Sequence, residues 1–337
     1  MIDAPLEKAV IYKNAQMAKA AGIEDFMVAL GYTISPVHTD DYYAQKTQMI
    51  TSCPDVDTIY LKDQGGLLIP ERLKTLVPAI QASLNGRPLE VHTHCTTGLG
   101  PLVYLEAIRL GIDTLHTAVP PLANGTGQPS IFNILKNIRY MGYGARINED
   151  DLNAYSMKLQ EIAKKEGRPV GVPLEYDLSY YEHQVPGGMV STLQRQLAET
   201  NQSHRLNEVY EEIINVRREL GYPIMVTPFS QFVATQATVN VVSGERYKII
   251  PDGVMEYVAG YFGEPPSPIE PNVLDKICRF PKTQKMMKEQ FPQPSVKDIR
   301  KEMNMDPDVS DEEFLLRYAL GNSAVDAMLA AGKKSAD

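Results

Sequence analysis

The sequence predicts an α/β fold in its first part, with parallel strands covered by helices, and a mostly helical second part. Up to about Gly144, short runs of apolar residues alternate with helical patterns, and the runs are too apolar to face water on either side. From about Asn148 onward, helical patterns dominate. We therefore expect two parts, comprising residues 1–145 and 146–337.

Each element of the first part has its own signal. Strands are expected over residues 26–30, 58–62, 89–94 and 114–118, which are short apolar or β-branched runs. Helices are expected over residues 6–21, 40–52, 70–86, 101–111 and about 131–138, where apolar residues recur at spacings of three and four. Met1–Asp3 is interpreted as the stub of an earlier strand.

The second part has few strand signals. Helices are expected over residues 150–166, 189–200, 206–221 and 310–320. Ser310 and Glu313 have the spacing of a capping box, which predicts the start of the last of these helices. Residues 333–337 are expected to form a frayed tail.

Composition excludes several classes of protein. The net charge of the 337 residues is −9 and no cluster of lysine and arginine forms a stripe, which argues against a nucleic-acid partner. No apolar run is long enough for a membrane span, and the N-terminus lacks a signal pattern, so we expect a cytoplasmic protein. Three widely spaced cysteines argue against a disulfide framework and fit a reducing compartment.

His92 and His94 stand one residue apart at the end of the strand expected over residues 89–94. Residues i and i+2 of a strand point to the same face, so both imidazoles project toward one point. Imidazole is the commonest metal ligand, and the pair is a candidate for two ligands of one ion. The alternative is one buried and one surface histidine. Cys95 faces away from the pair and is not expected to be a ligand.

Lys62 ends the strand that precedes the histidine strand. It is either a surface lysine whose stem packs on apolar neighbours or a desolvated amine with a lowered pKa. Such an amine reacts with carbon dioxide to give a carbamate, which is an anionic oxygen ligand for a metal. Two imidazoles and one carbamate would leave room for a fourth ligand and for substrate, as a catalytic site requires.

Six motifs follow one another along the chain, at residues 32–36, 61–68, 91–98, 125–130, 186–189 and 226–231. In this order they resemble the carboxyltransferase domain family of pyruvate carboxylase, the oxaloacetate decarboxylase alpha subunit and the transcarboxylase 5S subunit. The resemblance runs from about Asp3 to Leu320. It implies the C-terminal half of a (β/α)8 TIM barrel, followed by a mostly helical domain that completes the active site.

The resemblance implies roles for six residues. Lys62 matches the family's carboxylated, metal-bound lysine, and His92 and His94 match its two metal-bound histidines. The metal in such sites is a divalent ion, usually zinc, manganese or cobalt. Thr227 matches the threonine that shuttles a proton between biotin and the enol of the keto acid, while Ser230 and Gln231 match positions near the biotin ring. From the residues alone, a threonine before proline can simply start a turn.

The implied activity is the transfer of a carboxyl group between biotin and a 2-oxo acid of the pyruvate or oxaloacetate kind, through a metal-stabilised enolate. Two alternatives stay open. One is a Claisen-type barrel metalloenzyme, such as an aldolase or lyase, whose histidine pair would look alike. The other is a non-catalytic half barrel that only joins a larger carboxylase.

The sequence also departs from the family pattern. The family barrel has eight strands and this sequence predicts four, without the segments that supply the fourth metal ligand and bind the keto-acid carboxylate. We therefore expect a second polypeptide to supply the first half of the barrel, or two half barrels to associate as a homo-oligomer. His116 stands where relatives usually carry aspartate. No biotin-attachment sequence of the Ala-Met-Lys-Met kind is present, so the biotin carrier is expected to be another chain or domain.

Overall fold

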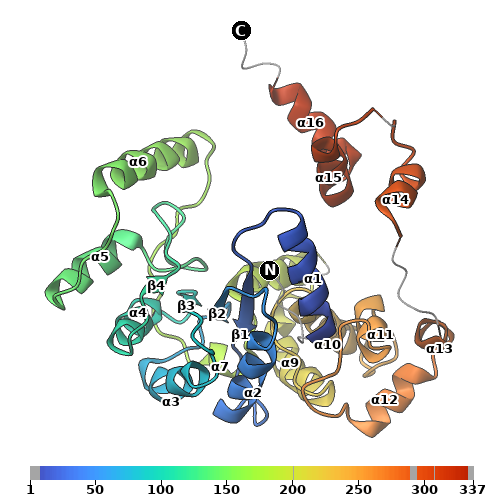
Figure 1. Cartoon of the computed structure of the whole chain (residues 1–337). Coiled ribbons are helices and arrows are strands. Elements are labelled where there is room, and N and C mark those ends of the chain that lie inside the picture. Colours follow the sequence, from blue (N-terminus) through green and yellow to red (C-terminus); the bar gives the residue numbers. More distant parts are fainter. Residues whose placement is uncertain (1–7, 200, 289–293, 307, 333–337) are drawn as a thin grey trace. The chain divides into compact units, whose positions relative to one another are not determined.

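A computed structural model describes residues 8–199, 201–288, 294–306 and 308–332 (Figure 1). The chain forms two compact units, Met1–Lys288 and Glu289–Asp337, which we describe separately. The expected strand stub at Met1–Asp3 and the expected tail at 333–337 lie outside the described residues. The boundary predicted between residues 145 and 146 falls inside the first unit and stays a prediction.

The first unit begins with alternating helices and strands. In order they are α1 (Lys8–Ala20), β1 (Met27–Gly31), α2 (Asp40–Thr51), β2 (Thr58–Asp63), α3 (Pro70–Gln81), β3 (Leu89–Thr93), α4 (Gly100–Arg109), β4 (Thr114–Leu115) and α5 (Ile131–Tyr140). Helices follow: α6 (Glu149–Lys165), α7 (Ser179–His183), α8 (Gly187–Glu199), the short 3-10 helix η1 (Ser203–Arg205), α9 (Leu206–Glu219), α10 (Phe229–Ser243), α11 (Asp252–Val258), α12 (Pro271–Cys278) and α13 (Pro281–Lys288). The second unit contains α14 (Val296–Glu302), α15 (Asp311–Leu320) and α16 (Asn322–Gly332).

The four strands form one parallel sheet in the order β1-β2-β3-β4, as the predicted α/β class requires. In its register Gly31 pairs with Lys62, and Lys62 pairs with His92. Within the described residues, β1 pairs only with β2 and β4 only with β3, so both edges of the sheet are open. None of the described helices is long and apolar enough to cross a membrane.

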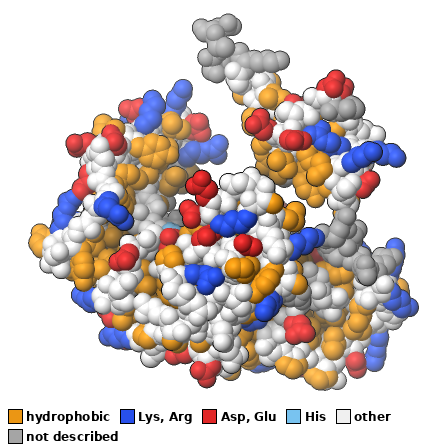
Figure 2. All heavy atoms as spheres, in the orientation of Figure 1, with side chains coloured by type: hydrophobic (Ala, Val, Ile, Leu, Met, Phe, Trp, Pro, Cys, Tyr) orange, Lys and Arg blue, Asp and Glu red, His pale blue; other side chains and the backbone are white. Residues whose placement is uncertain are grey.

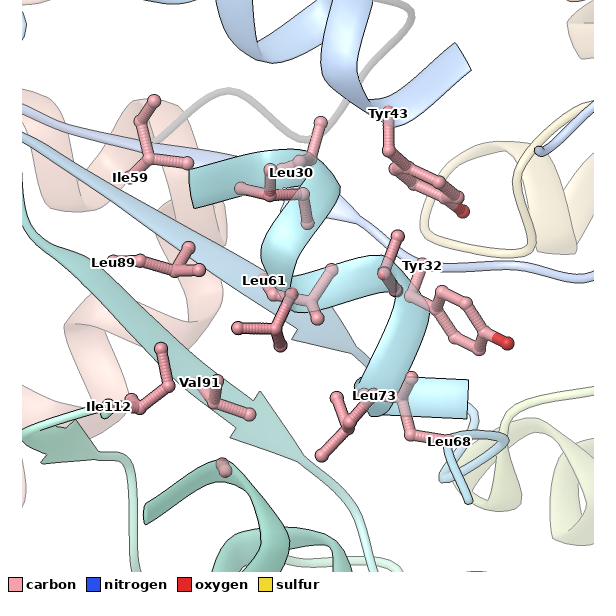
Figure 3. Packing of buried hydrophobic residues seen from close by; sticks show 14 of the residues in the cluster. Leu30, Tyr32, Tyr43, Ile59, Leu61, Leu68, Leu73, Leu89, Val91 and Ile112 are labelled. Carbon is pink, nitrogen blue, oxygen red and sulfur yellow. The ribbon is translucent and has the colours of Figure 1, made fainter. Parts of the chain in front are cut away.

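The two faces of the sheet differ in chemistry. Along β3, Leu89, Val91 and Thr93 are buried, whereas Glu90 and His92 are half-buried and point to the other face. The buried face packs on the helices between the strands, and Figure 3 shows Leu61 and Val91 gathered with Leu73 of α3. Burial of these side chains is the main favourable contribution to the stability of the sheet. The opposite face of β2 and β3 carries the polar side chains of Lys62, Glu90 and His92.

A second hydrophobic core lies in the helical region of the first unit and is built from residues between Val185 and Ile277. Its centre is an aromatic cluster in which Phe229 packs edge-on against Phe232 and Tyr257 at centroid distances of 5.6 and 5.9 Å. Helices α9 and α10 pack against each other in this core. The second core therefore holds the 226–231 motif at the start of α10.

Most predicted elements are present, with ends that differ by a few residues. The strand predicted over residues 114–118 was too long, because regular pairing ends at Leu115. After His116 the chain leaves β3, and Ala118 forms an isolated bridge with Ser130 instead. Ser310 caps α15 by accepting a hydrogen bond from the backbone N–H of Glu313, as its spacing predicted.

Candidate active site

The structure brings His92 and His94 together. Their Nε2 atoms lie 3.1 Å apart, so the predicted convergence of the two imidazoles is confirmed. Lys62 lies beside His92 because the two residues are paired in the β2–β3 register and therefore point to the same face of the sheet. Three of the six predicted site residues thus meet at the C-terminal ends of adjacent parallel strands, where α/β barrels carry their active sites.

Asp63 holds the loop that follows Lys62. Its buried carboxylate accepts hydrogen bonds from the backbone N–H groups of Leu67 and Leu68, both at 2.8 Å, and from the Thr93 hydroxyl at 2.7 Å. Burial raises the pKa of Asp63, and these three donors act in the opposite direction. Because the bond from Thr93 joins the ends of β2 and β3, it helps to hold Lys62 and His92 side by side.

His92 sits in an electrostatic environment that disfavours its charged form. Burial lowers its pKa to about 3, and the nearby His94, His116 and Lys62 contribute to the same shift. The imidazole is therefore neutral at physiological pH. A neutral imidazole has a free nitrogen lone pair, which metal binding requires.

Three further polar groups contact the pair. Gln128 places its amide nitrogen 3.1 Å from Nε2 of His94 and 3.3 Å from Nε2 of His92. His116 lies with its Nδ1 3.2 Å from Nδ1 of His92, and its Nε2 lies 2.7 Å from a carboxylate oxygen of Glu90. On the far side, Nδ1 of His94 donates to the backbone oxygen of Thr126 at 2.5 Å.

The sequence prediction did not include Glu90 or Gln128. The alternation of a strand could have indicated Glu90, which lies two residues before His92 and so shares its face. Gln128 belongs to an irregular loop, and no spacing rule connects it with the histidines. Cys95 does turn away from the pair, since its thiol packs against Gly100 at the start of α4.

The donor set fits a metal ion in part. Two imidazole nitrogens bound to one tetrahedral zinc ion at ~2.1 Å would lie about 3.4 Å apart, close to the observed 3.1 Å. Among the described residues, no group of three or more histidine, cysteine, aspartate or glutamate side chains is arranged to hold a metal. A site centred on His92 and His94 therefore needs a third ligand of another kind.

The 226–231 motif reaches the same end of the sheet. The amide of Gln64, two residues beyond Lys62, donates to the backbone oxygen of Met225 at 3.3 Å. Gly31 approaches Ile224 so closely that an added Cβ would lie 2.2 Å from the Ile224 side chain. The segment that carries Thr227 is therefore anchored next to the strand ends that carry Lys62 and Gly31.

The three predicted residues of this segment differ in exposure. Thr227 and Gln231 are exposed. Ser230 is buried, and its hydroxyl has no hydrogen-bond partner among the described residues. Buried hydroxyls are normally paired, so the unpaired hydroxyl of Ser230 is unusual.

Two other motifs serve to join the sheet to the second core. The Gln184 side chain accepts hydrogen bonds from the Thr33 hydroxyl at 2.9 Å and from the Ile34 backbone N–H at 3.0 Å. Gly187 lies against Thr96 and Thr126, where a Cβ would come within 2.6 Å of both side chains. Residues 32–36 and the segment from Gln184 to Gly187 are therefore held against neighbouring parts of the first unit.

Comparison with known proteins identifies relatives of this chain. Residues 180–336 match the family described as conserved carboxylase domain. The chain is 38% identical over 307 residues to a pyruvate carboxylase subunit of Methanocaldococcus jannaschii, covering 90% of this chain and 53% of that protein. It is 32% identical to the methylmalonyl-CoA carboxyltransferase 5S subunit of Propionibacterium freudenreichii subsp. shermanii, over 72% of this chain and 48% of that protein. The chain thus spans about half the length of these relatives.

The fold also matches solved structures. The carboxyl transferase domain of Rhizobium etli pyruvate carboxylase, solved with pyruvate and biocytin, superposes with a TM-score of 0.79 at 22% identity, over 95% of this chain and 56% of that one. This likeness confirms the predicted TIM-barrel class of fold. Sequence and fold agree: residues 180–336 match the conserved carboxylase domain family, and most of the chain is similar in sequence to the archaeal pyruvate carboxylase subunit and the transcarboxylase 5S subunit.

Proposed function

We propose that this chain is the carboxyltransferase subunit of a biotin-dependent carboxylase or decarboxylase that acts on a 2-oxo acid of the pyruvate or oxaloacetate kind. The observation that carries the proposal is the meeting of Lys62, His92 and His94 on one face of a parallel sheet, at its C-terminal end. The sequence similarity adds weight, since relatives named for pyruvate, 2-oxoglutarate and methylmalonyl-CoA match most of this chain.

In this proposal His92, His94 and a carboxylated Lys62 hold a divalent metal, which would be zinc, manganese or cobalt. The carbamate supplies the third ligand that the histidine pair lacks. When bound, such an ion acts as a Lewis acid that stabilises negative charge on the ketone oxygen of the substrate. The carbamate suits Lys62 because this residue pairs with the half-buried His92 in the sheet register, at the end of a largely buried strand.

The 226–231 segment carries the proton and the biotin contacts. Thr227 is an exposed residue, and in this proposal its hydroxyl passes a proton between biotin and the enol of the acid. Ser230 offers a buried, unpaired hydroxyl, and Gln231 offers an exposed amide beside it. Both groups suit the polar edge of the biotin ring, which the protein must bind and orient.

Partners complete the proposed enzyme. Biotin arrives on a carrier protein or domain outside this sequence. The open edges of the sheet are covered by polypeptide that forms the first half of the barrel, and two or more copies associate into a homo-oligomer. The proposal places the assembly in the cytoplasm, in keeping with three free cysteines.

A single substitution tests the proposal. Lys62→Ala, in the full chain with any partner that copurifies, should lose bound metal and biotin-dependent decarboxylation of oxaloacetate together. Lys74→Ala, which removes an exposed lysine of α3, is the matched control and should keep both. Metal is measured by plasma emission and decarboxylation by pyruvate release.

Other results would contradict the proposal in distinct ways. Metal and activity retained in Lys62→Ala would exclude the lysine as a ligand. Turnover of the acid without biotin would favour the Claisen-type metalloenzyme. If the wild-type protein carries no divalent metal when purified with its partner, the remaining interpretation is the non-catalytic half barrel.

A further inference from the structure

Glu90, His116 and His92 form a continuous line of hydrogen bonds on the polar face of the sheet. The Glu90 carboxylate lies 2.7 Å from Nε2 of His116, and Nδ1 of His116 lies 3.2 Å from Nδ1 of His92. Nε2 of His92 then faces His94. Every nitrogen of the two central rings is therefore used.

The position of His116 is tightly held. Its backbone N–H donates to the oxygen of Val91 at 3.0 Å, and its backbone oxygen accepts from the Tyr104 hydroxyl. The ring packs against Tyr60 with a centroid distance of 5.1 Å. Because β4 ends at Leu115, these contacts take the place of sheet pairing and aim the ring at His92.

The direction of the hydrogen bonds follows from what a metal ligand needs. If Nε2 of His92 is to offer its lone pair, the ring proton must sit on Nδ1. That N–H then donates to Nδ1 of His116, so His116 must carry its own proton on Nε2. The Nε2–H of His116 finds an acceptor in the carboxylate of Glu90. Each hydrogen bond then has one donor and one acceptor: His92 donates to His116, and His116 donates to the carboxylate of Glu90.

We propose that His116 and Glu90 are positioning residues, which hold His92 in the tautomer and orientation that bind a metal. The inference rests on the metal site of the proposed function and adds a carboxylate–histidine relay behind one of its ligands. Outer partners of this kind orient a metal-bound imidazole and raise its basicity. A purely structural ion pair between Glu90 and His116 would not require His116 to reach a second histidine.

The test compares two replacements of similar size. In His116→Asn the side-chain oxygen can take the place of Nδ1 and accept the proton of His92, whereas His116→Leu removes the acceptor. Zinc affinity of the full chain, with any copurifying partner, is measured by competition with a chelator. We expect about 10–100-fold weaker binding for His116→Leu and about threefold or less for His116→Asn. Glu90→Gln, whose amide oxygen accepts without charge, should fall between them.

Two controls separate a positioning role from a structural one. Glu212→Gln changes a carboxylate in the second core, where it accepts from Asn240, and should leave zinc affinity unchanged. Nitrogen-15 NMR of the zinc-bound wild type should show the His92 proton on Nδ1. Unchanged affinity in a folded His116→Leu protein, or a proton on Nε2 of zinc-bound His92, would overturn the inference. A wild type that binds no zinc would overturn the proposed function and this inference with it.

Discussion

Burial decides which protonation state single residues hold, and His183 shows this away from the proposed metal site. The ring stacks on Tyr210 at a centroid distance of 4.3 Å, and its Nδ1 accepts from the backbone N–H of Val185 at 3.0 Å. Only 3% of its surface is exposed. Burial lowers the pKa of His183 to about 4, and the Asp177 carboxylate opposes the shift.

This shift predicts a loss of stability in acid. The folded pKa lies below the unfolded value of about 6.5, so the unfolded chain binds more protons between these values. The neutral ring of His183 makes its full contribution to the free energy of unfolding above pH ~6.5. This free energy then falls by about 1.4 kcal/mol per pH unit as the pH drops toward 4. His183→Gln should flatten this part of the pH dependence. The measurement is the free energy of urea unfolding at about pH 7.5, 5.5 and 4.5.

The exposed His204 provides the matched control, since His204→Gln should keep the wild-type slope. The same slope in His183→Gln and wild type would show that His183 is not the group that titrates.

Prediction of neighbouring site residues succeeded where a spacing rule applied. It failed where residues distant in sequence are brought together only by tertiary structure. His92 and His94 could be paired because alternation along one strand places them together. Gln128 reaches the same point from 34 residues further along the chain than His94. Its position depends on how the loop after β4 closes, and no local pattern encodes that path.

At the scale of elements, Arg217 of α9 connects the second core to the end of β1. Its buried guanidinium donates to the backbone oxygens of Pro223 and Ile34, at 3.1 and 2.9 Å, and to the Thr33 hydroxyl at 2.9 Å. Burial lowers its pKa to about 10, which leaves it charged at neutral pH. One side chain thus holds the loop after β1 against the segment that leads to Thr227.

Arg217→Met should therefore destabilise the protein by about 3 kcal/mol, because it removes three hydrogen bonds made by a buried guanidinium, including the one to the buried Pro223 backbone oxygen. The neighbouring Arg218 is exposed, and Arg218→Met should change the free energy of unfolding by no more than about 0.5 kcal/mol. Urea unfolding of both variants beside wild type gives the comparison. Equal effects of the two substitutions would mean that the buried arginine does not act as a clamp.

Prediction of elements worked where one face of a helix is apolar and failed for α10. The residues buried along this helix cover more than half of its circumference rather than one narrow stripe; they are Phe229, Ser230, Phe232, Val233, Ala234, Gln236, Ala237 and Asn240. A helix covered on several sides has no simple spacing of apolar residues, so the pattern that predicted α9 was absent. The length of the strand after α4 was also overestimated. Residues 116–118 have the composition of a strand, but β4 ends at Leu115 and Ala118 forms only an isolated bridge with Ser130.

At the scale of the whole molecule, the proposed half barrel accounts for the polar face and the open edges of the sheet. Lys62, Glu90 and His92 lie on the face that a closed barrel would enclose. Large apolar side chains are also exposed on the first unit, as Figure 2 shows, among them Tyr140 of α5 and Met157 of α6. Exposed apolar surface of this kind marks places where further polypeptide binds.

The edge of β1 allows a prediction with an internal control. The backbone N–H of Tyr32 donates to the backbone oxygen of Lys62 at 2.7 Å, so the even-numbered residues 28 and 30 also bond toward β2. The backbone groups of residues 27, 29 and 31 must then point to the open edge. Polypeptide that forms the first half of the barrel would pair with them.

We therefore expect this chain alone to associate into larger species, and to form a defined complex with polypeptide that supplies the first half of the barrel. In the complex, hydrogen exchange should slow at the amides of Ala29 and Gly31, while Val28 and Leu30, already bonded to β2, should change little. Size-exclusion chromatography with light scattering and amide exchange by NMR measure these effects. A stable monomer whose odd-numbered β1 amides exchange at the same rate in both states would contradict the half-barrel interpretation, because an edge that needs no partner is not the broken edge of a barrel.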